Sequence, residues 1–193
     1  MRHQIAPAFR LMLVLTVLTG LVYPGVVTAI CQVLFHWQAN GSMLKAEGKE
    51  IGSALIGQNF TKPEYFHPRP SAAGNDGYDA TASGGSNYGP TNQKLIDRVK
   101  SSLEKFRKEN PDYKGPIPAD LLTASASGLD PDLSPASAEA QAARVAKARG
   151  ISLEQVDELI TQRTKGPDLG FLGEPRLNVL ELNLKLDQQF PLK

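Results

Sequence analysis

The sequence predicts a single N-terminal transmembrane helix followed by an α+β domain with a small sheet and about three helices. Three observations lead to this fold class. The chain contains no Lys, Arg, Asp or Glu between Arg10 and Lys45. Further on, apolar residues recur at helical spacing in segments that begin with capping residues. Near the C-terminus, leucines alternate with polar residues, which is the period of a half-buried strand.

The transmembrane anchor is expected over residues 11–36. Its apolar part would form a helix about 37 Å long, and the hydrocarbon core of a bilayer is only ~30 Å thick. Arg2 and Arg10 lie on the short N-terminal side of this stretch. The positive-inside rule therefore places residues 1–10 in the cytoplasm as a short tail.

The remainder of the chain is then expected on the other side of the bacterial inner membrane. Residues 37–50 are predicted to be a linker, and residues 51–193 an extracytoplasmic α+β domain. Trp37 and the preceding histidine suit the outer membrane interface, where aromatic side chains are enriched.

A cleavable signal peptide is the alternative interpretation of the N-terminus. The basic start, the apolar middle and the triplet Val27-Thr28-Ala29 are typical of such a signal. The apolar stretch continues past this triplet to Phe35, beyond the roughly 7–15 residues of a usual signal core. A lipoprotein is disfavoured because the bulky Ile30 precedes Cys31. An uncleaved anchor is the favoured reading.

Four small residues in the anchor suggest that it packs against another membrane helix, because small residues let helices in lipid approach closely. They form two small-x-x-x-small pairs: Thr16 with Gly20, and Gly25 with Ala29. Gly and Ala are also common in membrane spans in general, so ordinary composition is the alternative explanation for these four residues. Pro24 should kink the helix or interrupt its regular hydrogen bonding.

Composition excludes several classes of protein. Arg2 and Arg10 account for two of the 21 basic residues, which leaves 19 basic against 20 acidic residues beyond them. A near-neutral domain argues against nucleic acid as a partner. The single cysteine, Cys31, lies inside the predicted anchor, so the domain cannot be a disulfide-built scaffold.

The N-terminal half of the domain is expected to contain one strand, one loop and one helix. Residues Ile51 to Phe60 are predicted to be a strand that bends at its glycines. Ser71 to Pro90 is a polar loop, either mobile or held by a partner. Thr91 to Asn110 carries one apolar stripe and ends before a proline, which predicts a helix.

Two further helices and a strand are expected in the C-terminal half. One helix begins at Ser134-Pro135 and ends at Gly150. The next begins with a capping box formed by Ser152 and Gln155, and ends before Gly166. Leu180, Leu182, Leu184 and Leu186 alternate with polar residues. They predict a strand that pairs with the one over residues 51–60.

Few residues could carry catalysis. His67 is the only histidine clearly beyond the anchor and has no cysteine beside it, so a metal site is not indicated. Asp130 and Asp132 flank a proline and could act as paired carboxylates, although turn and cap roles are more common at such positions. The glycine-rich segment Ser83 to Asn87 could present backbone amides to an anion. No P-loop pattern is present.

Taken together, these motifs resemble one family, the C chain of Kdp-type potassium-transporting ATPases. The resemblance covers almost the whole chain. It rests on Ser53-Ala54-Leu55-Ile56-Gly57-Gln58, Tyr65-Phe66, Arg69-Pro70-Ser71-Ala72, Ser83-Gly84-Gly85-Ser86-Asn87, Gly89-Pro90-Thr91-Asn92, Pro118, Asp120-Leu121, Thr123-Ala124-Ser125, Gly128-Leu129-Asp130-Pro131, Gln141, Arg144-Val145-Ala146, Ala148-Arg149-Gly150, Leu172-Gly173-Glu174-Pro175-Arg176, Asn178-Val179-Leu180 and Leu182-Asn183-Leu184. Two positions depart from the pattern: Ala126 replaces the usual glycine, and Asp132 the usual histidine.

The resemblance implies a non-catalytic accessory subunit of an ATP-driven, high-affinity potassium importer. Its implied partners are a channel-like potassium-binding subunit, a P-type ATPase subunit that hydrolyses ATP, and a small membrane subunit. The resemblance also implies a catalytic-chaperone role that raises the nucleotide affinity of the pump. The residues it implicates in nucleotide binding are Ser83, Gly84, Gly85, Ser86 and Gln141. No resident cofactor is implied.

The predicted topology conflicts with direct nucleotide binding, since ATP is cytoplasmic and the domain is expected outside. We therefore favour the hypothesis that the anchor clamps the channel-like subunit while the domain sits over the ion entrance. Any influence on nucleotide affinity would then be indirect. A membrane-anchored exported hydrolase that uses Asp130 or Asp132 is the alternative.

Overall fold

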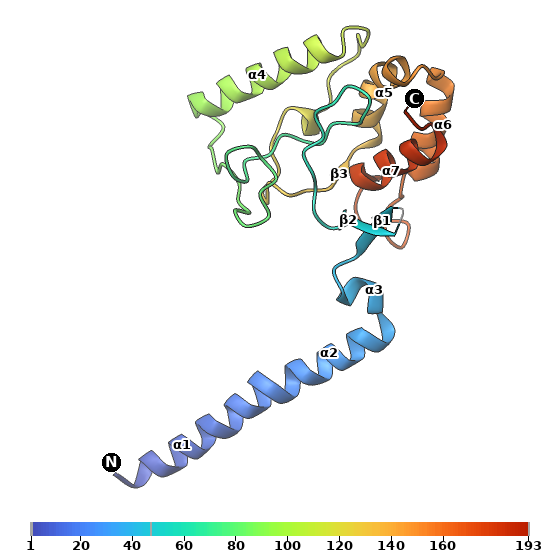
Figure 1. The fold of residues 1–193 in the computed structure, drawn as a ribbon. Helices are drawn as coiled ribbons and strands as arrows, with labels where there is room; N and C mark the ends of the chain where they lie inside the picture. The colour runs from blue at the N-terminus through green and yellow to red at the C-terminus, as the bar shows by residue number, and fades with distance from the viewer. Residues whose placement is uncertain (1, 47, 193) are drawn as a thin grey trace.

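The computed structural model describes residues 2–46 and 48–192, in which a long N-terminal helix leads to a separate folded domain (Figure 1). The helix comprises α1 (Arg2–Val17), the π-helical turn η1 (Leu18–Val22) and α2 (Tyr23–Leu34). From His3 to Leu34 it is long and apolar enough to cross a membrane, and none of its most apolar window is buried within the chain. This confirms the predicted single apolar helix ahead of a folded domain.

The regular hydrogen bonding of the anchor is interrupted directly before Pro24, as expected. In η1 the amide of Tyr23 donates to the carbonyl of Leu18, five residues back instead of four. Proline has no amide hydrogen, and a π-helical turn absorbs the irregularity without ending the helix. The apolar helix therefore continues to Leu34.

A short helix and a two-stranded hairpin connect the anchor to the domain. Helix α3 spans His36–Ala39, and β1 (Met43–Ala46) pairs with β2 (Lys49–Ser53) in an antiparallel sheet. The prediction of a strand from Ile51 to Phe60 is therefore wrong in extent and in partner. The strand ends at Ser53 because the chain turns there: the amide of Ile56 donates to the carbonyl of Ser53.

The predicted helices lie close to their expected positions. They are α4 (Gln93–Glu109), α5 (Pro135–Arg149) and α6 (Leu153–Arg163). The Ser134 side chain caps α5, Gly150 ends it in the left-handed conformation, and α6 begins with the predicted capping box. Caps and stops are local signals, and they place these helices correctly.

The strand predicted over Leu180 to Leu186 is wrong, because this segment forms helix α7 (Val179–Gln189). The side chain of Asn178 caps it by accepting a hydrogen bond from the amide of Glu181. Beyond Val179 the helix contains no β-branched residue, and most of its residues are good helix formers. The helix buries residues at helical spacing, including the polar side chain of Asn183.

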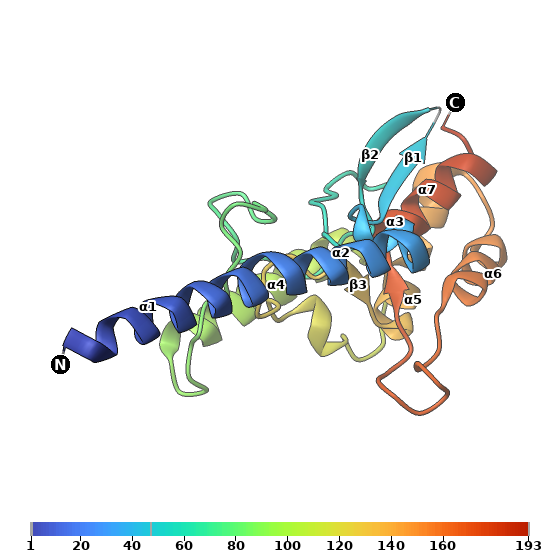
Figure 2. The same cartoon turned by 90° about the horizontal axis from the view of Figure 1, so that it is seen from below.

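The second small sheet joins β3 (Asp132–Leu133) to β4 (Leu177–Asn178). It lies next to α7 and, with α5 and α6, surrounds the main hydrophobic core. Figure 2, which views the molecule from below, shows these elements gathered at the end where the anchor arrives. The largest fully buried side chains are Phe66, Leu133, Leu159, Leu177, Leu182 and Leu186.

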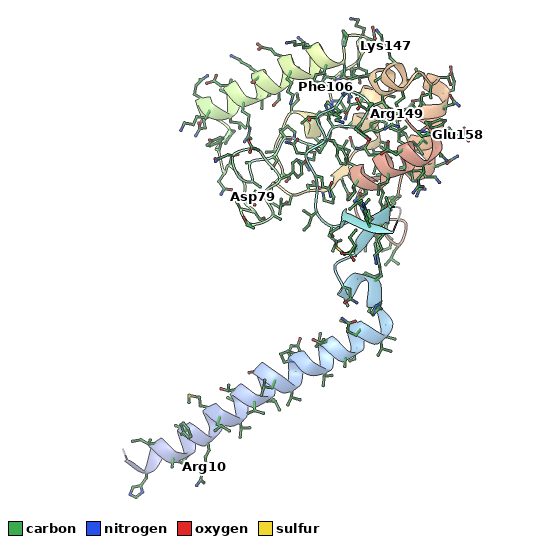
Figure 3. All side chains as sticks on the ribbon, in the orientation of Figure 1. Arg10, Asp79, Phe106, Lys147, Arg149 and Glu158 are labelled. Atoms are coloured by element: carbon green, nitrogen blue, oxygen red, sulfur yellow. The ribbon has the colours of Figure 1, made fainter. Side chains whose placement is uncertain are left out.

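The segment from Ser71 to Pro90 has no helix or strand, as predicted, but much of it is held by internal hydrogen bonds. The Ser71 hydroxyl donates to the carbonyl of Gly128 at 2.6 Å and accepts from the amides of Ala73 and Tyr78. At the tip, the Asp79 carboxylate accepts from the amide and hydroxyl of Thr81, which lowers the pKa of Asp79. Figure 3 shows Asp79 on this loop, away from the α5–α6 pair.

Candidate functional site

The four small residues of the anchor come toward one side of the helix. They are Thr16, Gly20, Gly25 and Ala29. At about 100° per residue, a regular helix would place the two pairs on nearly opposite faces. The π-helical turn between them accommodates one extra residue, so the rotation lags by roughly 100°. All four positions then fall within about a third of the helix circumference.

The glycine-rich segment packs backbone against backbone onto the loop that precedes β3. The amide of Gly84 and the hydroxyl of Ser83 both donate to the carbonyl of Ser127, at 2.9 and 3.0 Å. A Cβ atom on Gly85 would lie 2.8 Å from the carbonyl oxygen of Ala126. This close approach therefore requires a glycine at position 85. The contact lies at Ala126, one of the two positions that depart from the family pattern.

Gln141 is buried and uses both ends of its amide within the domain. Its Oε1 accepts from the amide of His67 at 2.8 Å, and its Nε2 donates to the carbonyl of the same residue at 3.1 Å. Nε2 also donates to Ser137, and Oε1 also accepts from Arg144. The side chain thereby fastens α5 to an extended segment, in the way that a neighbouring strand would.

Asn183 of α7 holds the backbone of the preceding residue, Phe66, in the same way. Its Oδ1 accepts from the amide of Phe66 at 2.8 Å, and its Nδ2 donates to the carbonyl of Phe66 at 3.0 Å. The backbone of Phe66 and His67 is thus held between α7 and α5 by two side-chain amides. No sheet contains these two residues, so the amides replace the missing strand partners.

Of the residues implicated in nucleotide binding, Gln141 lines a cavity that the glycine-rich segment does not line. A cavity of about 350 Å³ lies between α4 and the segment 59–78, and Gln141 and His67 line it together with Arg98 and Lys105. No residue from Ser83 to Ser86 lines it. A nucleotide site that uses both groups stays a prediction. The Gln141 side chain, the Ser83 hydroxyl and the Gly84 amide are engaged with other parts of the domain.

The carboxylates of Asp130 and Asp132 are each paired with an arginine. Arg69 Nη1 lies 2.6 Å from Asp130 Oδ2, and Arg176 Nε lies 3.5 Å from Asp132 Oδ2. Burial raises the pKa of Asp132, and the neighbouring Asp130 charge raises it further, while Arg176 opposes both. Asp130 also accepts from the amide of Asp132 at 3.1 Å, so it serves as a turn residue.

His67 occupies a structural position beside α4. Its Nδ1 lies 3.3 Å from Glu109 Oε2, and its Nε2 lies 2.9 Å from the carbonyl oxygen of Lys62. Burial raises the pKa of Glu109, but the interactions with His67, Lys105 and Arg144 together outweigh it, so the pKa falls. Among residues 2–46 and 48–192, no group of three or more His, Cys, Asp or Glu is placed to hold a metal ion.

Comparison with known proteins identifies the family. The profile described as "KdpC: K+-transporting ATPase, c chain" matches residues 5–188. The chain is 58% identical to the potassium-transporting ATPase KdpC subunit of Myxococcus xanthus, over 95% of this chain and 87% of that one. It is 54% identical to the KdpC subunits of Koribacter versatilis and Rhodospirillum rubrum, over its full length and nearly all of theirs. The chain belongs to the KdpC family. It is thus an accessory component of a potassium import complex.

The structural roles of several polar residues in this KdpC-family domain were not predicted. Arg149 is almost fully buried and joins α5 to α7, and Tyr78 donates its hydroxyl hydrogen to the carbonyl of Arg69. Burial, and the nearby Asp130 charge, raise the pKa of Tyr78. Arg144 donates to four different residues, and its burial lowers its pKa to about 10. The sequence feature that could have predicted the role of Arg144 is an arginine within an otherwise alanine-rich helix. Such a helix packs closely against its neighbours, so its long side chains have few routes to solvent.

Proposed function

We propose that this chain is a non-catalytic subunit whose anchor packs on the channel-like potassium-binding subunit of its complex. Membership of the KdpC family supports a role within the complex. The arrangement of the anchor carries the proposal: the π-helical turn gathers two pairs of small residues on one side of a helix whose most apolar window is not buried by the described part of the chain. A helix built in this way favours close contact with a second membrane helix.

Under this proposal the domain stabilises the assembly of the complex and does not catalyse a reaction. The carboxylates that a hydrolase would use, Asp130 and Asp132, are each paired with an arginine. His67 is engaged on both ring nitrogens. The further proposed partners are the P-type ATPase subunit, which hydrolyses ATP, and a small membrane subunit. Any effect on nucleotide affinity passes through the complex as a coupling between sites.

Bulky substitutions in the anchor should release the chain from its complex. Gly20→Leu combined with Gly25→Leu is expected to lower the yield of this chain that co-purifies with the potassium-binding subunit by about tenfold, because a loss of ~1.4 kcal/mol in helix packing changes the equilibrium by that factor. Apart from the adjacent residues and the nearby backbone of the same helix, no atom of residues 2–46 and 48–192 lies within 4 Å of a Cβ atom on either glycine. The substitutions therefore leave the isolated chain unstrained.

Val26→Leu is the matched control, because it adds bulk to an exposed anchor residue next to Gly25 but on another face. It should co-purify like the unmodified chain. Equal recovery of the double glycine variant and this control, measured from detergent extracts of native membranes, would contradict the proposed contact.

We propose further that the domain is extracytoplasmic and the N-terminal tail cytoplasmic, on the strength of the basic residues before the anchor. Arg10 lies near the N-terminal end of the helix, far from the domain (Figure 3). In a Cys31→Ala background, Lys100→Cys on α4 should react with a membrane-impermeant maleimide in intact spheroplasts. His3→Cys should react only after permeabilisation, and the reverse pattern would refute the orientation.

A further inference from the structure

The connection between β4 and the preceding helix forms a second hairpin with an unusual tip. Residues 165–176 are closed by backbone hydrogen bonds in both directions between Lys165 and Arg176, at 2.8 and 2.9 Å. A second bridge joins Asp168 to Leu172, with the amide of Asp168 donating at 2.8 Å. The hairpin is therefore a defined structure. We refer to residues 169–172 as its tip.

The tip exposes three large apolar side chains and packs none of them in the core. The exposed fractions are 83% for Leu169, 74% for Phe171 and 50% for Leu172. Leu169 has a φ of 54°, in the left-handed region that costs a branched side chain energy. The three side chains are therefore available to a surface outside the chain.

The charged residues of the hairpin lie outside its tip, at Lys165, Asp168, Glu174 and Arg176. Arg176 lies 3.3 Å from Asp168 and 3.5 Å from Asp132, and Lys165 lies 3.0 Å from Glu181. No charged residue lies between Asp168 and Glu174. The hairpin thus has an apolar tip on a stem whose charges are largely paired, which is the distribution expected of a segment that crosses from water into an apolar layer.

The domain is held close to the end of the anchor by a short, hydrogen-bonded connection. The indole Nε1 of Trp37 donates to Met43, and the amide of Ser42 donates to the carbonyl of Trp37 at 3.0 Å. The Ser53 hydroxyl donates to Gly41 at 2.7 Å. Only residues 35–42 separate α2 from β1, so the base of the domain stays near the point where the anchor leaves the membrane.

The hairpin projects from this base. In Figure 1 the salmon-coloured chain before β4 descends beside β1 and β2, on the side where the anchor arrives. In Figure 2, seen from below, it protrudes on the opposite side of the anchor end from the β1–β2 hairpin. The tip and the β1–β2 hairpin therefore flank the site where the chain meets the membrane.

We propose that the tip of this hairpin inserts into the lipid headgroup region of the membrane and acts as a second, shallow contact of the domain with the bilayer. Lipid fits the tip better than a protein surface does. The tip is convex, its leucine and phenylalanine side chains are exposed on a narrow turn, and it offers no charged side chain to a partner between Asp168 and Glu174. This contact with the bilayer is expected in either orientation of the chain, and it is independent of the proposed function.

The only tryptophan of the chain, Trp37, allows a direct test. In a Trp37→Phe background, the full chain carrying Phe171→Trp is reconstituted into phosphatidylcholine vesicles that contain lipids brominated near the headgroup end of the acyl chain. An interfacial side chain lies roughly 5–10 Å below the headgroup boundary, so the emission of this variant should fall about twofold relative to vesicles without bromine. Iodide added to the water should quench it poorly.

Leu153→Trp in the same background is the control, because Leu153 is an exposed apolar residue at the start of α6, on the part of the domain away from the anchor. It should be quenched by iodide and unaffected by brominated lipid. Circular dichroism verifies that both variants fold. The proposal is overturned if Phe171→Trp behaves like this control, or if neither quencher reaches it, since the second result would mean that protein covers the tip.

Discussion

Gln141→Leu is expected to destabilise the domain by about 2–4 kcal/mol and to lower its melting temperature by roughly 5–15 °C. Leucine has a similar size and suits a helix, but it cannot hydrogen-bond to the amide and carbonyl of His67. Two backbone groups would then lose their partners inside the domain, together with the bond from Arg144. Unfolding of the full chain in mild detergent, followed by circular dichroism, measures the change.

The same substitution at an exposed glutamine provides the control. Gln188→Leu lies on α7, where the side chain is exposed, and it should change the unfolding free energy by no more than about 0.5 kcal/mol. If Gln141 instead contacts a ligand directly and contributes little to the fold, both variants would unfold at the same temperature. Separating these results matters, because any loss of pump activity in a Gln141 variant would otherwise be attributed to nucleotide binding.

Arg149→Leu should destabilise the domain by a similar or larger amount, about 3–5 kcal/mol. Only 1% of the Arg149 side chain is exposed, and its Nη2 lies 2.6 Å from Asp187. It also donates to the carbonyls of Glu64 and Phe190, both at 2.8 Å, and its guanidinium lies over the ring of Tyr65. The substitution removes a group that ties α5, α7 and the C-terminal segment to the loop before Phe66.

Lys147→Leu on the same helix is the control for the loss of a positive charge. Lys147 pairs with Asp112 at 4.0 Å, and both side chains are well exposed, so the change should be within about 0.5 kcal/mol. Figure 3 shows Lys147 at the outer edge of the domain and Arg149 within it. Urea unfolding of the two variants side by side tests the difference, and equal midpoints would mean that Arg149 is hydrated and not structural.

Gln141 and Arg149 belong to a set of polar side chains that explains how a domain with so little sheet remains ordered. The segment around Phe66 is extended but joins no strand, and it is held by Gln141 and Asn183 through their amides and by Arg144 and Arg149 through their guanidinium groups. Helices α5 and α7 therefore contribute polar side chains to the interior.

The amino-acid sequence by itself determined the features that depend on neighbouring residues. The anchor follows from an uninterrupted apolar stretch, and its irregular turn follows from Pro24, because proline removes a hydrogen-bond donor wherever it stands. The starts of α5 and α6 follow from Ser134 and from the capping box of Ser152 and Gln155. Such signals act within one turn of helix, so no tertiary contact is needed to interpret them.

Only the tertiary structure decided the features that depend on residues far apart in the chain. The alternating leucines after Asn178 satisfy both a strand and a helix, and α7 is selected because Leu182, Asn183 and Leu186 face the core together with α5 and α6. The role of Gln141 likewise depends on His67, 74 positions away. Burial and hydrogen-bond partners of this kind come from packing, and the local pattern of a sequence does not contain them.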